Sequence, residues 1–524
     1  MTLIKPYLHK NIIPQSQTKF NILLISIFAI ITLLGILNHA MWRDEINGWL
    51  IARDSVSLSQ FIQNIQYEGH PILWYFCLWI LNQLTSNPIA MQIFHWFIAV
   101  GCFSLFILFS PFTKQQKILF IFGYLPLYEY SLISRNYSIG IFCIFLFCTC
   151  FFIRHKTYIP LAIILVIMAN TNAYCLLLSM ALALTLAFEY IFQSYLAYET
   201  KANINNIILA IIIFSIGILL SILMLIPPQD STLQGGASQW ILEFDWNRLN
   251  QTITRIWRSY ILILIPSDSK PFDLVLFAIL SLGLFGFCIT MLIRKPVVLF
   301  FYIIASLQFL LFTYIKFLGS QRHYGHLYII LISSLWLSNY YKSSNLFIKY
   351  LNQLPHKLKH IWLNWFRFVN HYKTIFIMII LWLQLIAGGV AFGRDLLTPY
   401  SASRATANFI KENNLFTNII VGSEDFTVSP ISGYLNQKIY YPENQKLGSY
   451  VLFSDQRKLV EDREILAQIS QLITPENPKV LLILNRELQD KRDDLNIAFV
   501  AKFKKAFIYN EKYYLYQLYK KSNL

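Results

Sequence analysis

Long apolar runs recur along this chain and constrain its fold more than any other feature. They start at residues 20–37 and continue to residues 374–392. Many approach the roughly 20 residues that an α-helix needs to cross a hydrocarbon core of about 30 Å. Only 13% of the residues are charged and 56% are hydrophobic, which excludes an ordinary soluble protein. The sequence therefore predicts a mainly α-helical, polytopic membrane protein.

Positive charge between these runs indicates which loops face the cytoplasm. Lys5, Lys10 and Lys19 precede the first run. Cytoplasmic loops carry an excess of Lys and Arg, so we expect the chain to start inside. The same rule accounts for the net charge of +16 without a nucleic-acid partner. Basic clusters then recur in alternate loops, at Lys114 and Lys117, Arg154 and Lys156, Arg294 and Lys295, and within residues 342–373.

The apolar run at residues 71–84 decides the number of spans. It is short, and counting it as a span would move every later basic cluster to the outside. We therefore expect an interfacial or re-entrant helix there, within a first outer loop of residues 39–87. The other runs predict about eleven transmembrane helices, among them residues 20–37, 88–110, 118–132, 139–153, 207–226, 296–315 and 374–392.

The chain changes character after residue 393. Apolar runs shorten to strand length and charged residues return, with strand and helix patterns in alternation. This pattern predicts a transmembrane domain of residues 1–393 and a small extracytoplasmic α/β domain of residues 394–524. Its expected helices are residues 405–413 and 461–472, and its expected strands are residues 418–421, 438–441, 479–484, 497–503 and 513–519, the last two as a hairpin.

Polar residues of the first outer loop are the strongest functional signal. Asp44 and Glu45 directly follow the first span, and Glu68 lies in a Glu-Gly-His-Pro turn beside His70. Under the predicted topology, four more polar residues reach the same side at span ends: Arg135, Tyr137, Arg322 and His323. We expect these acids and bases to meet in one pocket that opens away from the cytosol.

Such a pocket suits an amphiphile with a phosphate head and a lipid tail. Ionisable groups at bilayer depth cost at least about 2.5–3.5 kcal/mol, so they pair or face a cavity. Arginines and histidines would hold the phosphate, and a carboxylate would accept the proton of an incoming hydroxyl. A second carboxylate would hold a divalent cation that neutralises the leaving phosphate. Phosphate-binding glycine loops and cysteines at metal-ligand spacing are absent from the sequence, which argues against a nucleotide-sugar site.

These motifs resemble those of the polytopic GT-C glycosyltransferases, the superfamily of protein O-mannosyltransferases and of the aminoarabinose transferase that modifies lipid A. The matching features are the Asp44-Glu45 pair after the first span, the outer loop ending in Glu68-Gly69-His70-Pro71, Ser134-Arg135-Asn136-Tyr137, and Arg322-His323-Tyr324 before a late span. The resemblance covers nearly the whole membrane part, by topology as much as by motif.

The resemblance implies an inverting enzyme that takes a sugar from a polyprenyl-phosphate donor. The acceptor would be a glycan, lipid or protein at the outer face of a bacterial inner membrane. Asp44 would be the general base, with Glu45 and Glu68 as further catalytic acids. The transfer would be either metal-independent or metal-assisted, and in the second case Asp44 and Glu68 would be ligands of a Mg²⁺ or Mn²⁺ ion. Glu68 matches the acid of a Glu-Lys-Pro turn, but His70 replaces the lysine here. His70, Arg135, Tyr137, Arg322 and His323 would bind the donor.

Structural interpretations compete with these roles. Glu45 would then pair with Arg43 or cap the loop helix, Arg135 and Arg322 would anchor spans at lipid head groups, and Tyr137 would belong to an aromatic belt. Two other functions also stay open. A lipid-linked oligosaccharide ligase would use paired arginines of a second outer loop, such as Arg248, Arg255 and Arg258. A lipid flippase or transporter would show repeated halves, which the sequence lacks.

Overall fold

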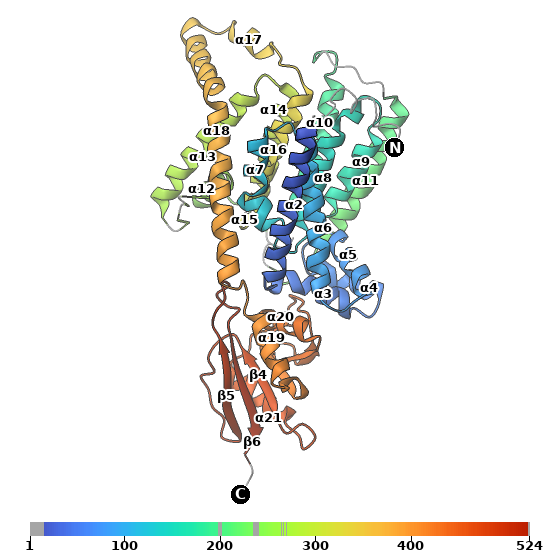
Figure 1. The fold of residues 1–524 in the computed structure, drawn as a ribbon, viewed down its shortest axis with the longest axis vertical. Coiled ribbons are helices and arrows are strands. Elements are labelled where there is room, and N and C mark those ends of the chain that lie inside the picture. The colour runs from blue at the N-terminus through green and yellow to red at the C-terminus, as the bar shows by residue number, and fades with distance from the viewer. Residues whose placement is uncertain are drawn as a thin grey trace.

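A bundle of helices carries a sheet domain at one end (Figure 1). The computed structural model describes residues 15–196, 202–233, 240–263, 265, 267, 268 and 270–521. Lys5 and Lys10, which are expected on the cytoplasmic side, are not among the residues described. Within them the chain is mainly helical, and the sheet is confined to the C-terminal part.

Among the residues that the structure describes, eight helices are long and apolar enough to cross a membrane, which is the architecture of a multi-pass membrane protein. They are α2 (Gln15–Asn38), α6 (Ile89–Phe109), α8 (Tyr137–Cys150) with its 3-10 extension η2 (Phe151–His155), α10 (Ala173–Ile191), α11 (Ile204–Leu225), α13 (Pro271–Leu292), α14 (Pro296–Ile315) and α18 (His356–Leu397).

Three of the expected spans are not among these eight long helices, so the number eleven stays a prediction. Two of them are the 11-residue α9 (Ile159–Ala169) and the 12-residue α16 (His326–Leu337). The expected helix at residues 118–132 is wrong as a single element. It consists of α7 (Lys114–Ile121) and a π-helix, η1 (Tyr124–Glu129), which contains Pro126. Proline lacks the N–H that a continuous α-helix requires, so it favours such a break.

The two loops that are predicted to lie outside contain helices of their own. The first comprises α3 (Arg43–Asp54), α4 (Leu58–Gln66) and α5 (Leu73–Asn82). With ten residues, α5 is too short to span, in agreement with the interfacial or re-entrant helix expected there. The second contains α12 (Trp246–Tyr260), which packs on α13 and is buried at its C-terminal half. The remaining short helices are α15 (Gln321–Tyr324), η3 (Ser338–Tyr340) and α17 (Leu346–Leu351).

The C-terminal domain is a six-stranded mixed sheet in the order β3-β2-β1-β4-β6-β5. Apolar clusters cover both of its faces, with α19 and α20 on one and α21 on the other. Most predicted elements are confirmed, including the β5–β6 hairpin; α20 and β3 were not predicted. The elements are α19 (Ser403–Glu412), η4 (Leu415–Thr417), β1 (Ile419–Ser423), α20 (Asp425–Leu435), β2 (Ile439–Tyr441), β3 (Lys446–Gly448), α21 (Asp462–Leu472), β4 (Val480–Leu484), β5 (Leu495–Phe503) and β6 (Tyr513–Lys520).

Helix α18 joins the bundle to this domain and packs closely on the break between α7 and η1. A Cβ atom at Gly388 would lie 2.6 Å from the carbonyl oxygen of Phe122 and 2.8 Å from the carbonyl carbon of Gly123. Both are backbone atoms, which cannot move aside as a side chain can. A glycine is therefore required here for the two segments to touch.

We expect Gly388→Ala to destabilise the protein by about 1–3 kcal/mol, because overpacking must push α18 away from the backbone beside η1. Gly389→Ala is the matched control, since a Cβ there meets nothing within 4 Å of the residues described. Thermal unfolding of the two purified variants in detergent measures the difference. Equal unfolding temperatures would contradict the close contact.

Candidate functional site

A cavity of about 260 Å³ lies where the first loop, the ends of several bundle helices and the C-terminal domain meet. The membrane part supplies charged and aromatic residues, and the C-terminal domain supplies the facing wall. The lining residues are Arg43, Asp44, Asn47, Glu68, Gly69, His70, Arg135, Ala173, Tyr174, Leu233, Phe312, Phe317, Arg322, His323, Phe426, Ser429, Val451 and Phe453. Six of the eight predicted site residues are among them.

Asp44 and Arg322 form an ion pair in this cavity, although 278 positions separate them in the sequence. Arg322 Nη2 donates to Asp44 Oδ2 at 2.7 Å, and the Arg322 guanidinium lies 5.2 Å from the ring centroid of Trp42. Asp44 occupies the first turn of α3, where the helix dipole favours a negative charge. Early acids and late bases therefore meet in one pocket for six of the eight predicted residues, and the opening of this pocket away from the cytosol stays a prediction.

Arg135 connects the first loop to the segment before α8. Its Nη1 donates to the backbone carbonyl of Asp44, and its Nη2 donates to His70 Nε2 at 3.1 Å. Burial, together with Arg135 and Arg322, lowers the pKa of His70 well below its usual value. His70 is therefore a neutral imidazole that accepts a hydrogen bond from Arg135, and its own proton is on Nδ1.

Glu68 faces the same cavity from the turn between α4 and α5. Its Oε1 accepts from Asn47 Nδ2 at 2.6 Å, and its Oε2 accepts from the Tyr75 hydroxyl at 3.2 Å. Burial raises the pKa of Glu68 against the opposing effect of Arg135. The turn depends on Gly69, whose φ of +66° is a left-handed conformation that side chains disfavour.

His323 and Tyr137 form an aromatic group on the membrane side of the cavity. Burial, followed by the charge of Arg322, lowers the pKa of His323 well below its usual value. Its Nδ1 accepts from the backbone N–H of Ser320 at 2.8 Å, so the neutral ring carries its proton on Nε2. Tyr137 is buried and does not line the cavity; its ring lies 5.6 Å from that of His323 and 6.3 Å from that of His70.

Glu45, expected among the catalytic acids, lies outside the cavity lining and is fully buried. Its Oε1 accepts from the backbone N–H of Ser134 at 2.6 Å, and its Oε2 lies 2.9 Å from His39 Nε2. The other ring nitrogen of His39 lies 2.8 Å from Asp395 at the end of α18. The hydrogen bonds hold Glu45 in this position, where it ties α3 to Ser134, next to Arg135.

The charge state of His39 predicts a pH dependence of stability. Burial alone would lower the pKa of His39, but the carboxylates of Glu45 and Asp395 raise it to about 10. The folded pKa lies above the unfolded value of about 6.5, so this stabilisation is complete below pH 6.5 and is lost as the pH rises towards 10.

We therefore expect the difference in unfolding temperature between wild type and His39→Gln to be largest near pH 6.5 and to shrink towards pH 10. Thermal unfolding of detergent-solubilised protein across this range measures it. His371→Gln, at an exposed position on α18, is the matched control. A gap that is independent of pH would show that His39 is not charged in the folded protein.

The donors expected for Mg²⁺ or Mn²⁺ have other partners in the structure, and a cation site on Asp44 and Glu68 stays a prediction. No group of three or more His, Cys, Asp or Glu side chains able to hold a metal occurs among the described residues. Asp44 is paired with Arg322, and both oxygens of Glu68 accept from Asn47 and Tyr75. Neighbouring guanidinium groups would also repel a divalent cation.

Residues that the sequence did not single out complete the site. The sequence suggests Arg43 only as a partner of Glu45. In the structure Arg43 lines the cavity and binds the C-terminal domain. Phe426 and Phe453 form the wall from that domain, and their rings are 6.1 Å apart. Their position depends on tertiary packing and leaves no local sequence signal. Comparison of the sequence with protein-family models and with curated proteins finds no match.

Proposed function

We propose that this protein is a membrane glycosyltransferase of GT-C type that moves a sugar from a polyprenyl-phosphate donor to an acceptor hydroxyl. The observation that carries the proposal is the Asp44–Arg322 ion pair inside a cavity with two further arginines, at the end of an apolar bundle. A base and several phosphate-binding cations are thus close to the membrane, where a lipid-linked donor would be held.

The two walls of the cavity suggest that the donor binds on one side and the acceptor on the other. Tyr174, Phe312 and Phe317 belong to α10, α14 and the segment after α14, so a donor whose tail stays among the helices would enter from this side. The opposite wall belongs to the C-terminal domain. The acceptor would approach there.

In the proposed reaction the acceptor oxygen attacks the anomeric carbon of the sugar. The bond from that carbon to the phosphate oxygen breaks, and its electron pair leaves with polyprenyl phosphate. Asp44 takes the proton of the attacking hydroxyl. The guanidinium groups of Arg135 and Arg322 and the Nε2–H of His323 stabilise the charge that develops on the phosphate. Arg322 would turn from Asp44 to the incoming phosphate, which frees the carboxylate to act as the base.

The remaining residues are assigned supporting roles. Glu68, with its raised pKa, would share a proton with the acceptor, while His70 orients Arg135. Glu45 would position α3 and the segment before α8 without touching the substrate. We place the cavity and the C-terminal domain outside a bacterial inner membrane, because the basic clusters then face the cytoplasm.

The test is sugar transfer by the purified full-length protein in proteoliposomes supplied with labelled polyprenyl-phosphate sugars and a mixture of cell-envelope glycan, lipid and protein acceptors. Transfer from the lipid-linked sugar, with none from nucleotide sugars, is the expected result. Movement of labelled lipid across the bilayer without transfer would instead support a flippase. Arg255 and Arg258 lie next to Asp268 and do not line the cavity, so nothing in it favours an oligosaccharide ligase.

A further inference from the structure

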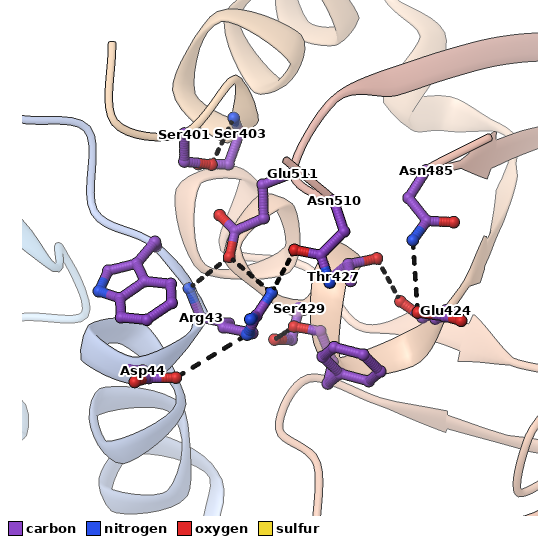
Figure 2. Close-up of polar contacts among 12 residues, drawn as sticks. Arg43, Asp44, Ser401, Ser403, Glu424, Thr427, Ser429, Asn485, Asn510 and Glu511 are labelled. Atoms are coloured by element: carbon purple, nitrogen blue, oxygen red, sulfur yellow. Dashed lines mark hydrogen bonds and ion pairs between the residues drawn. The ribbon is translucent and has the colours of Figure 1, made fainter. Parts of the chain in front are cut away.

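Arg43 is the one arginine of the cavity whose side chain binds the C-terminal domain. Its Nη1 donates to Asn510 Oδ1 at 2.7 Å and lies 3.6 Å from Glu511 Oε1 (Figure 2). Its backbone N–H also donates to Glu511 Oε1 at 3.2 Å. Its Nε lies 3.8 Å from Asp44 Oδ1, and its Nη2 has no hydrogen-bond partner among the described residues.

Asn510 and Glu511 lie in the loop between β5 and β6, which contacts Arg43 at the start of α3. Glu511 is fully buried, and the next strand starts only two residues later, at Tyr513. The same loop is tied to the segment between α18 and α19, because the backbone N–H groups of Phe507 and Ile508 donate to the carbonyls of Pro399 and Tyr400 at 2.9 and 3.0 Å. The loop is therefore fixed by β6 and by the segment after α18, and its Asn510 and Glu511 side chains fix the position of Arg43.

The guanidinium of Arg43 is fixed close to the base of the proposed reaction. The Phe426 ring lies 5.2 Å from it, and the Trp42 ring lies 5.1 Å from it, so aromatic rings restrict it as well. A planar guanidinium on a residue that lines the cavity is suited to binding a phosphate oxygen. Only 24% of the side chain is exposed, so the cation is partly desolvated and its interaction with an anion is stronger than in water.

Resting on the proposed function, we propose that Arg43 is a third phosphate-binding arginine of the donor site, and that Asn510 and Glu511 of the C-terminal domain are the positioning residues that hold it there. The C-terminal domain would then complete the donor site in addition to providing the acceptor wall. In this proposal Asn510 and Glu511 affect phosphate binding only through Arg43. Their substitution should therefore have no effect once Arg43 is removed, a result that a general loss of stability would not produce.

The experiment measures binding of a polyprenyl phosphate, and of the uncharged polyprenol as reference, to the full-length protein in nanodiscs. We expect Arg43→Ala to weaken phosphate binding roughly tenfold to hundredfold, as for the loss of a hydrogen bond to a charged group. Asn510→Ala with Glu511→Ala is expected to weaken it about tenfold, and Glu511→Gln, which keeps the accepting oxygen, far less. Polyprenol binding stays unchanged in all of them.

The decisive comparison is made in the Arg43→Ala background, where adding the two loop substitutions should change binding by less than about twofold. Glu487→Gln, an exposed position in the same domain, is the matched control. Additive losses, or unchanged binding in Arg43→Ala with normal thermal unfolding, would overturn this inference alone. A wild-type protein that binds polyprenyl phosphate no better than polyprenol would overturn the proposed function as well.

Discussion

Replacing Asp44 with asparagine is expected to lower the rate of sugar transfer by about 10²–10⁴-fold, the usual contribution of a general base. Asparagine has almost the same volume and can still accept a hydrogen bond from Arg322, so the cavity should keep its shape. It carries no charge and cannot take the proton of the attacking hydroxyl. Transfer kinetics with a labelled polyprenyl-phosphate sugar measure the change.

The loss should appear in kcat, whereas the KM for the donor should stay the same or fall. In the variant Arg322 no longer shares its charge with a carboxylate, so the phosphate meets less competition. Asp490→Asn, in a partly exposed ion pair with Arg463 far from the cavity lining, is the matched control. Undiminished transfer by Asp44→Asn would remove Asp44 as the base.

Replacing Arg322 with alanine is expected to reduce transfer by about 10²–10³-fold. This is the effect of losing one preorganised group that stabilises charge in a transition state. The substitution also leaves Asp44 without its closest cation and removes the group that packs on Trp42. The KM for the donor should rise and kcat should fall, because Arg322 binds the phosphate in the ground state and the phosphate gains charge in the transition state.

Arg322→Lys separates charge from geometry. Lysine keeps the positive charge but lacks the planar pair of N–H donors and the stacking on Trp42, so we expect it to restore only part of the activity. Arg463→Ala, with 84% of the wild-type side chain exposed, is the control for a lost arginine. Wild-type donor KM and kcat in Arg322→Ala would contradict its role in phosphate binding.

The sequence predicted most of the fold because both of its signals are local. Apolar length predicts the long helices, and apolar runs of strand length predict β1, β4 and the β5–β6 hairpin. The sequence does not predict helix α20, because Thr427, Ser429, Pro430 and Gly433 are typical of a loop. The packing of α20 on β1 and α3 overrides that local preference.

The candidate site was predicted less evenly. Asp44, Glu68, Arg135 and Arg322 stood out because ionisable residues near long apolar runs are costly unless they have a role. Glu45 carries the same signal, yet its neighbour His39 and the distant Asp395 decide that it is buried instead. The partners of Arg43 lie more than 460 positions away, at a distance that no spacing rule reaches.

Helix α18 has 42 residues, and only residues 398–402 separate its end from α19. At 1.5 Å per residue it is a continuous rod of about 63 Å that carries the C-terminal domain directly. Asp395, bound to His39, fixes this rod near its end. If the proposed reaction takes place in the cavity, the rigid α18 keeps the distance between the cavity and the membrane helices constant. An acceptor would then be selected by its reach as well as by its chemistry, since its hydroxyl must descend to that level.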